Sequence, residues 1–229
     1  MNYVLIGDVH SQAKNLKAAL KFIQKEIKNS RVVFLGDLFD SKNSYSDSFG
    51  VYELVKEAEL NLNAIVMQSN HQDKLIRYLR GNQILLNNGL DTTISELSNH
   101  ISLDELYTWL IRQPFGIVFK DIYDVEFRCA HAYFSDEIKV PQYEEEYFIR
   151  AIKKEHKHQF LYGTQDLNRN RIEWWTQNNQ EQSFIRVAGH YRTLTIDLNN
   201  KSIVLDSCCG DANGKLSIYD VNSRQLHQF

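Results

Sequence analysis

Residues 31–36 read RVVFLG, an apolar and β-branched run that leads directly into two acidic residues, Asp37 and Asp40. Such a run is typical of a strand that is buried on both faces of a parallel sheet. A free carboxylate is costly in these surroundings unless it is paired. The segment therefore favours a fold in which a compensating group, such as a divalent cation, lies at the end of this strand.

Four other apolar segments also end in Asp, Asn or His. YVLIG (3–7) precedes Asp8 and His10, AIVMQS (64–69) precedes Asn70 and His71, VEFRCA (125–130) precedes His131, and RVAG (186–189) precedes His190. In open α/β sheets, ligand sites form at the carboxyl ends of the strands. Side chains two residues apart on an extended segment point the same way, so Asp8 and His10 can serve one ion.

Strands and helices alternate in the N-terminal third, which predicts βαβ units and an α/β fold with parallel strands. We expect strands at 3–7, 31–36 and 63–68, and helices at 11–29, 48–60 and 73–81. Residues 103–113 are also helix-like. The C-terminal half is rich in strand-like segments, at 116–119, 125–130, 184–189, 193–198, 202–207 and 215–221. Between them, residues 143–157 favour a helix on which three consecutive glutamates form a solvated face.

Composition excludes several classes of function. A net charge of −3 argues against a grip on duplex nucleic acid or an anionic membrane, but it leaves a nucleotide or a nucleic-acid end open as substrate. Three cysteines, two of them adjacent, favour packing thiols in a cytoplasmic protein over a disulfide framework or a zinc finger. The chain has no apolar stretch of about 18 residues. Its N-terminus, MNYVLIG, is unlike a signal peptide.

Taken singly, each polar residue at a strand end has an ordinary explanation. An Asp or Asn there commonly caps a helix or starts a turn, and a His beside a strand is commonly a hydrogen-bonded surface or core residue. Five such ends together favour one shared site. Carboxylate, amide and imidazole ligands without thiolate suit Mn, Fe, Zn or Ni. We therefore predict a dinuclear centre of two divalent metal ions, with Mn²⁺ preferred and Fe, Zn or Ni as alternatives.

The ordered motifs GDVH, GDLFD, SNH, AHA and GHY resemble those of the calcineurin-like metallophosphoesterases. Within that superfamily they resemble the branch of phosphoprotein phosphatases and diadenosine tetraphosphatases, which reads GDxHG, GDxxDRG, GNHE, H(A/G)G and GHT. Residues 204–221 resemble its closing segment, and residues 70–97 resemble the phosphatase module of bacterial polynucleotide kinase-phosphatases. The resemblance implies a β-sandwich of mixed sheets flanked by helices, in a single domain that covers residues 1–229.

The resemblance also implies a role for each motif residue. Asp8, His10 and Asp37 would hold the first metal, and Asp37 would bridge to a second metal held by Asn70, His131 and His190. His71 would be the general acid at the leaving oxygen, with Asp40 as its orienting partner. Chemistry asks for the same roles, because a metal pair activates hydroxide and an alkoxide leaving group needs a proton.

The chain departs from the family pattern after Asp40. Ser41 and Lys42 stand where the family has Arg-Gly, and that arginine normally binds the substrate phosphate through two parallel hydrogen bonds. A lysine supplies the charge without this geometry. We predict phosphate contacts from Asn70, Lys42 and Arg171, with Arg192 as a weaker candidate than Arg171; an ordinary surface arginine is the alternative for both.

Three functions remain open at this point. The first is a phosphoesterase that hydrolyses phosphomonoesters, and some phosphodiesters, of nucleotides or RNA ends by attack of metal-activated hydroxide. The second is a protein Ser/Thr phosphatase or a diadenosine tetraphosphatase. The third is a non-catalytic phosphate-binding protein on a degenerate fold, which the complete set of ligand residues disfavours.

Overall fold

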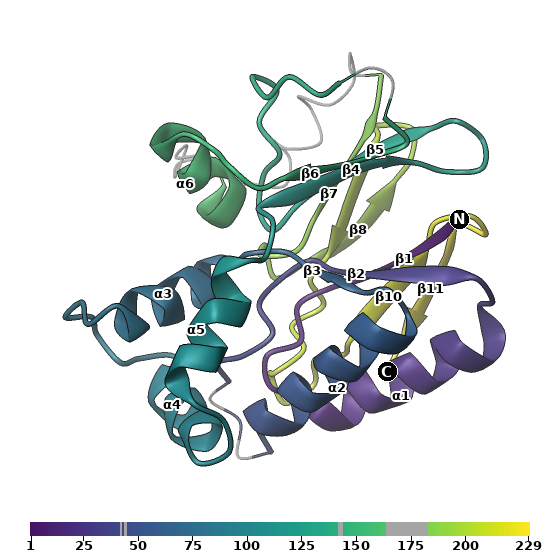
Figure 1. Cartoon of the computed structure of the whole chain (residues 1–229). Helices are drawn as coiled ribbons and strands as arrows, with labels where there is room; N and C mark the ends of the chain where they lie inside the picture. The colour runs from purple at the N-terminus through teal and green to yellow at the C-terminus, as the bar shows by residue number, and fades with distance from the viewer. Residues whose placement is uncertain (42, 44, 142–143, 164–182) are drawn as a thin grey trace.

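The computed structural model describes residues 1–41, 43, 45–141, 144–163 and 183–229. In this part of the chain, two mixed β-sheets pack face to face and helices cover their outer sides (Figure 1). This arrangement confirms the predicted fold class, an α/β sandwich of mixed sheets flanked by helices. That the domain covers residues 1–229 stays a prediction.

The first sheet contains the N-terminal strands. Its order is β11 (Gln225–Gln228), β10 (Ser217–Asp220), β1 (Asn2–Ile6), β2 (Ser30–Phe34) and β3 (Ile65–Val66). The strands β1, β2 and β3 are parallel, as the alternation of strands and helices predicted, whereas β10 pairs antiparallel with β1 and β11 with β10. The chain thus returns from its far end to complete the N-terminal sheet.

The second sheet is built from the later strands. Its order is β6 (Glu146–Ile149), β4 (Gly116–Lys120), β5 (Glu126–Ala130), β7 (Ile185–Ala188), β9 (Ser202–Leu205) and β8 (Leu194–Asp197). The pairs β5–β7 and β7–β9 are parallel and the other pairs are antiparallel. Because β5 and β7 run in the same direction, the loops that follow them emerge at one edge of the sheet.

The helices in the described ranges lie outside the two sheets. They are α1 (Ala13–Glu26), α2 (Ser48–Asn61), α3 (Asn70–Leu79), α4 (Leu90–Ser98), α5 (Leu103–Ile111) and α6 (Lys154–Tyr162). Helices α1 and α2 cover the first sheet, α6 covers the second, and α3, α4 and α5 gather beside the edge where strand β3 ends (Figure 1). The longest of these helices has 14 residues, so none in this part of the chain has the length and apolar character of a membrane span.

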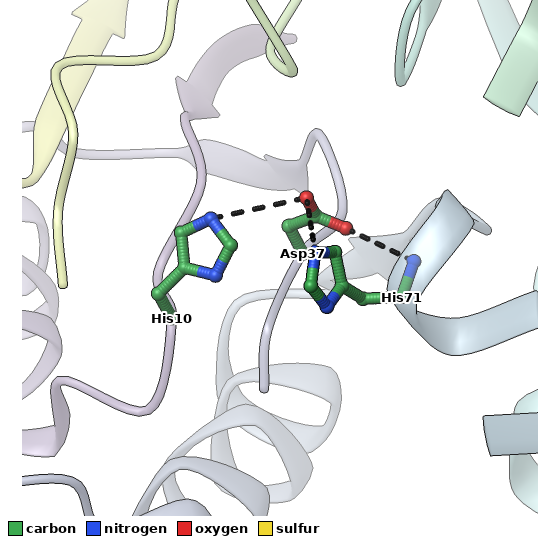
Figure 2. Close-up of side chains that lie close together, drawn as sticks. All are labelled: His10, Asp37 and His71. Atoms are coloured by element: carbon green, nitrogen blue, oxygen red, sulfur yellow. Dashed lines mark hydrogen bonds and ion pairs between the residues drawn. The ribbon is translucent and has the colours of Figure 1, made fainter. Parts of the chain in front are cut away.

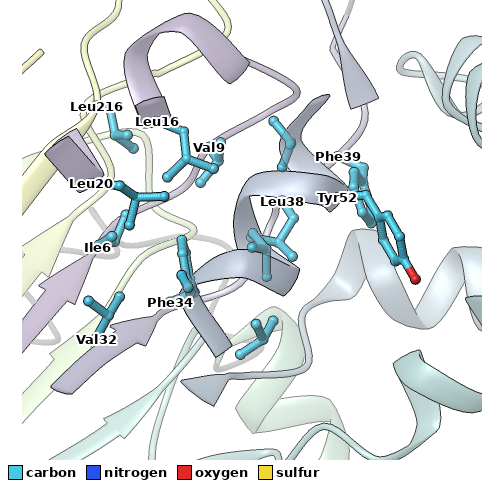
Figure 3. Close-up of a cluster of buried hydrophobic side chains, with 14 of the residues drawn as sticks. Ile6, Val9, Leu16, Leu20, Val32, Phe34, Leu38, Phe39, Tyr52 and Leu216 are labelled. Carbon is cyan, nitrogen blue, oxygen red and sulfur yellow. The ribbon is translucent and has the colours of Figure 1, made fainter. Parts of the chain in front are cut away.

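Alternating side chains of the first sheet are buried on both of its faces. Tyr3 and Leu5 of β1 belong to the cluster between the two sheets, where Phe119 and Phe127 of the second sheet also lie. Their neighbours Val4 and Ile6 point to the opposite face and pack among residues of α1 and α2 (Figure 3). This double burial explains why the strands read as continuous apolar runs rather than as alternating patterns.

Four segments differ from the sequence-based prediction, among them strand β11, which was not predicted. Helix α3 begins at Asn70 rather than at residue 73, because the Ser69 hydroxyl caps it by accepting a hydrogen bond from the backbone N–H of Gln72. Helix α4 was not predicted. The helix expected over 143–157 is wrong in its described first half, where β6 pairs with β4.

Candidate functional site

The loops that follow β1, β2, β5 and β7 meet at one edge of the sandwich. The backbone carbonyl of Asp37 accepts hydrogen bonds from the backbone N–H groups of Val9, at 3.0 Å, and His10, at 2.9 Å. Between the sheets, a Cβ on Gly36 would lie 2.8 Å from the His131 ring, and one on Gly189 would lie 2.0 Å from an Asp8 carboxylate oxygen. Glycine at these two positions therefore lets the two sheets bring their polar residues together.

Asp37 lies at the centre of the site. Its Oδ2 atom is 3.4 Å from the Nε2 atom of His131, 3.8 Å from that of His10 and 4.0 Å from that of His71. Figure 2 shows His10 and His71 directed at this carboxylate from two different segments. Burial alone would raise the pKa of Asp37, but the facing imidazoles of His131, His71 and His10 hold it well below its ordinary value. The carboxylate is thus an anion surrounded by imidazole nitrogens.

Asp8 and His10 flank one side of Asp37. The Nδ1–H of His10 donates to the carbonyl oxygen of Asp40, at 3.0 Å, which leaves Nε2 as the nitrogen that faces Asp37 and lies 4.0 Å from Asp8 Oδ2. The other Asp8 oxygen, Oδ1, is buried without a hydrogen-bond partner among the described residues. Burial first, and then the charges of Asp206 and Asp37, raise the pKa of Asp8 well above its usual range.

His131 organises the other side of Asp37. Its Nδ1–H donates to the carbonyl oxygen of Leu35, at 2.9 Å, so that Nε2 is the nitrogen that faces Asp37. Three atoms surround that Nε2: Oδ1 of Asn70 at 2.7 Å, Nδ1 of His190 at 3.2 Å and Oδ2 of Asp37 at 3.4 Å. The ligand atoms of Asp37, His131 and His190 all lie within 4.8 Å of one another.

These residues fit a pair of divalent cations. Buried acceptors converge here, and Oδ1 of Asp8, which has no hydrogen-bond partner among the described residues, is an acceptor that a cation would satisfy. His10 and His131 each donate their Nδ1–H to a backbone carbonyl, the support that metal-binding imidazoles usually have. The structure therefore brings together all six residues that were predicted to hold metal: Asp8, His10, Asp37, Asn70, His131 and His190.

His71 and Asp40 form a hydrogen-bonded pair beside this cluster. Nδ1 of His71 lies 2.8 Å from Oδ2 of Asp40. Burial lowers the pKa of His71, but the charge of Asp37 and the hydrogen bond with Asp40 outweigh it and raise the pKa to about 9. Helix α4 fixes Asp40, since the hydroxyl of Thr93 accepts a hydrogen bond from its backbone N–H at 3.1 Å. Helix α4, which was not predicted, thus holds in place Asp40, the predicted orienting partner of His71.

A pocket of about 410 Å³ opens over the cluster. Its walls include His10 and His71 from the centre and, around them, Asp40, Ser41, Asn88, Arg192, Asp206, Cys208, Gly210 and Asp211. Asp206 was not predicted as a site residue, although the same signal was present: it follows the apolar strand β9 as Asp8 follows β1. Of the predicted phosphate contacts, Asn70 lies at the site, whereas Lys42 and Arg171 fall outside the described residues.

A family model described as calcineurin-like phosphoesterase matches residues 1–203 of the chain. Among curated proteins, the chain is similar to the asymmetrical bis(5′-nucleosyl)-tetraphosphatase PrpE of Oceanobacillus iheyensis, with 34% identity over 105 residues. That alignment spans 42% of this chain and 40% of the relative, so it covers less than half of either protein.

Solved structures extend the similarity to the whole fold. A protein provisionally designated a diadenosine tetraphosphatase has a TM-score of 0.64 at 22% identity, over 100% of this chain and 92% of that chain. A metallophosphoesterase from Sphaerobacter thermophilus has a TM-score of 0.54 at 14% identity, over 100% of this chain and 88% of that chain. At these identities the likeness concerns the fold.

Proposed function

The chain belongs to the calcineurin-like phosphoesterase family, and on that premise we propose that it hydrolyses phosphoesters with the help of two divalent metal ions, Mn²⁺ before Fe, Zn or Ni. The observation that carries the proposal is the position of the Asp37 carboxylate within 4.0 Å of three imidazole nitrogens from three separate segments. A single carboxylate with donors on both sides suits a ligand that bridges two ions.

The proposed ligands divide into two sets that share Asp37. Asp8 and His10 would complete the first set, and Asn70, His131 and His190 the second. Two divalent ions in such a site activate water for attack and neutralise the phosphoryl oxygens. The mixture of carboxylate, amide and imidazole supports Mn²⁺ as the first metal to test.

His71 supplies the proton in this proposal. Its Nδ1 is engaged by Asp40, so Nε2 is the nitrogen that would donate a proton to the leaving oxygen. Part of the support for protonated His71 comes from the charge of Asp37, which metal ions would neutralise, while the hydrogen bond with Asp40 remains. Asp40 would thus orient the ring and stabilise its protonated form during turnover.

The substrate class follows from the loop after Asp40. Ser41 is buried in the pocket wall and holds a position where the family has a phosphate-binding arginine. A phosphomonoester dianion loses more from that absence than a diester with one charge. We therefore propose phosphomonoesters of nucleotides or RNA ends as substrates, together with some phosphodiesters, including 2′,3′-cyclic nucleotides. The likeness to a bis(5′-nucleosyl)-tetraphosphatase favours a dinucleoside polyphosphate as the second candidate. A phosphoprotein remains the other alternative.

A substrate panel tests this function. The chelator-treated protein, with and without added Mn²⁺, would be assayed on p-nitrophenyl phosphate, bis-p-nitrophenyl phosphate, 2′,3′-cyclic AMP, diadenosine tetraphosphate, phosphate-ended RNA and a phosphopeptide. We expect turnover of several nucleotide esters, dependent on metal and stronger with Mn²⁺ than with Mg²⁺. Full activity in excess chelator would contradict the proposal, and specific turnover of the phosphopeptide alone would favour a protein phosphatase.

The three cysteines are free thiols, which supports our proposal that the enzyme works in a reducing compartment such as the cytoplasm.

A further inference from the structure

Arg192 is the permanent cation in the wall of the pocket, as far as the described residues go. The other ionisable groups there are the imidazoles of His10 and His71 and the carboxylates of Asp40, Asp206 and Asp211, together with the Cys208 thiol. A wall with so many acids repels an anionic substrate except where a cation compensates. The position of Arg192 therefore bears directly on which phosphates the pocket accepts.

The backbone of Arg192 is fixed relative to the centre. Its N–H donates to Oδ2 of the buried Asp206 at 2.6 Å, and the other oxygen of Asp206 accepts from the N–H of Cys208 at 3.0 Å. Arg192 and Cys208 both have positive φ, 52° and 58°, a conformation that such residues hold only where their surroundings impose it. Arg192 also follows His190 by two residues, so its starting point is tied to a proposed metal ligand.

The guanidinium itself lies at the rim rather than the floor of the pocket. The side chain of Arg192 is 65% exposed and forms an ion pair with Asp211, which is 50% exposed, whereas Asp37 is almost completely buried. An exposed ion pair of this kind contributes little to stability, so a stronger anion can displace the carboxylate. A phosphate offers more charge and two parallel acceptors for the guanidinium.

We propose that Arg192 binds a second, non-reacting phosphate of the substrate, in place of Asp211, while the reacting phosphate lies at the centre beneath it. The inference rests on the proposed function and, among its candidate substrates, favours compounds with two or more linked phosphates. Nucleoside polyphosphates, dinucleoside polyphosphates and triphosphate-ended RNA belong to that class. A pocket of about 410 Å³ has the size of a site for a small molecule rather than for a single phosphate.

Competitive inhibition measures this contact. Orthophosphate reports binding at the centre, and inorganic tripolyphosphate reports binding at the centre and the rim together, with Mn²⁺ kept in excess of both. Hydrolysis of p-nitrophenyl phosphate is the readout, and the quantity of interest is the ratio of the inhibition constant for tripolyphosphate to that for orthophosphate. We expect Arg192→Gln to raise this ratio by about 10-fold, as the loss of a charge-assisted hydrogen bond predicts.

Two further variants separate the contact from a general effect of charge. Asp211→Asn frees the guanidinium and should lower the ratio by about 3-fold, in line with the small energy of an exposed ion pair. Arg112→Gln removes an equal charge from the exposed end of α5 and should leave the ratio unchanged. An unchanged ratio in Arg192→Gln, or the same rise in Arg112→Gln, would overturn the inference.

The inference and the proposed function can fail separately. If the wild-type protein hydrolyses p-nitrophenyl phosphate but the ratio of inhibition constants is the same in Arg192→Gln, the proposed subsite is wrong and the proposed function stands. If the Mn²⁺-loaded protein hydrolyses no phosphoester, the proposed function is wrong, and titration calorimetry with tripolyphosphate then decides the subsite. Binding that is equal in wild type and Arg192→Gln overturns it, and binding that weakens in the variant supports it.

Discussion

The two ends of the strands use the same unusual backbone conformation in different ways. Residues with positive φ precede several strands, at Asn29, Asn63, Asp124, Lys201 and Arg224. They also follow strands, at His10, Ser11, Asp37, Asp40, His190, Arg192 and Cys208. The first group occupies short turns. The second group lies at the candidate site.

Burial distinguishes the two ends. Asn and Asp adopt positive φ several-fold more readily than other residues, and Asn29, Asn63 and Asp124 are exposed turn residues of this kind. The other two, Lys201 and Arg224, are half-buried, whereas Ser11, Asp37 and Asp40 at the strand exits are buried. Each such residue costs about 1–3 kcal/mol and persists where the surroundings determine it. The residues with positive φ that follow strands thus hold strained backbone at the candidate site, whereas those that precede strands form turns that connect the elements of the fold.

The largest expected effect comes from replacing the central carboxylate, Asp37, in the loop that follows β2. Asp37→Asn removes the negative charge that we assign to both metal ions, so turnover of p-nitrophenyl phosphate should fall on the order of 10⁴-fold. The matched change at a strand start is Asp124→Asn, which also has positive φ but lies in the exposed β4–β5 turn. Its kcat/KM should stay within twofold of wild type. Comparable losses in both variants would remove the distinction between the two ends.

The proton donor gives the next largest effect. If His71 protonates the leaving oxygen, His71→Ala should slow esters with poor leaving groups by about 10²–10⁴-fold. p-Nitrophenyl phosphate leaves readily without a proton, so it should lose much less. Asp40→Asn keeps the imidazole but holds it less firmly in orientation. This variant should also slow esters with poor leaving groups more than p-nitrophenyl phosphate, by a smaller factor than His71→Ala. Equal losses on both substrates would assign His71 to folding or metal binding instead.

Much of this site was accessible from the sequence, because its residues follow apolar runs whose strands end at one edge. Helix α4 was missed, since its sequence LDTTISELS carries β-branched threonines and follows Gly89 rather than a capping side chain. The segment 146–149 was mistaken for helix because the three consecutive glutamates at 144–146 suggested a solvated helix face. In the structure, Glu146 accepts hydrogen bonds from the hydroxyl of Tyr3, at 2.8 Å, and from Nη1 of Arg31, at 2.6 Å. These partners are more than 100 positions away, so no local pattern contains them.

Metal binding should stabilise the folded protein through the loops that follow the strands. Most of the proposed ligands lie in those loops, and none lies in the turns that precede the strands. Burial, followed by the charges of Asp206 and Asp37, raises the pKa of Asp8 well above its usual range, a cost that a bound cation would offset. A ligand that binds only the folded state at 100 times its Kd stabilises by about 2.7 kcal/mol. We therefore expect Mn²⁺ to raise the Tm of the chelator-treated protein, and Asp8→Asn to reduce the shift. A Tm independent of Mn²⁺ would contradict the metal site, and Asp124→Asn serves as the control with a full shift.

The smallest expected effect concerns the turns that precede the strands. Asn29 precedes β2 with φ at 54°, and its carbonyl oxygen accepts a hydrogen bond from the backbone N–H of Asn2 at 3.3 Å. Alanine tolerates that conformation less well than asparagine, so Asn29→Ala should lower the free energy of unfolding by about 1 kcal/mol. For a chain of this length, that corresponds to a Tm lower by about 2–4 °C. Glycine adopts positive φ freely, so Asn29→Gly should stay close to wild type in Tm.

Both variants should keep wild-type kcat/KM on p-nitrophenyl phosphate, because the turn is not among the residues that line the pocket. If alanine and glycine gave the same Tm, backbone conformation would not be what asparagine contributes at this position, and the contrast with the strand exits would rest on burial alone.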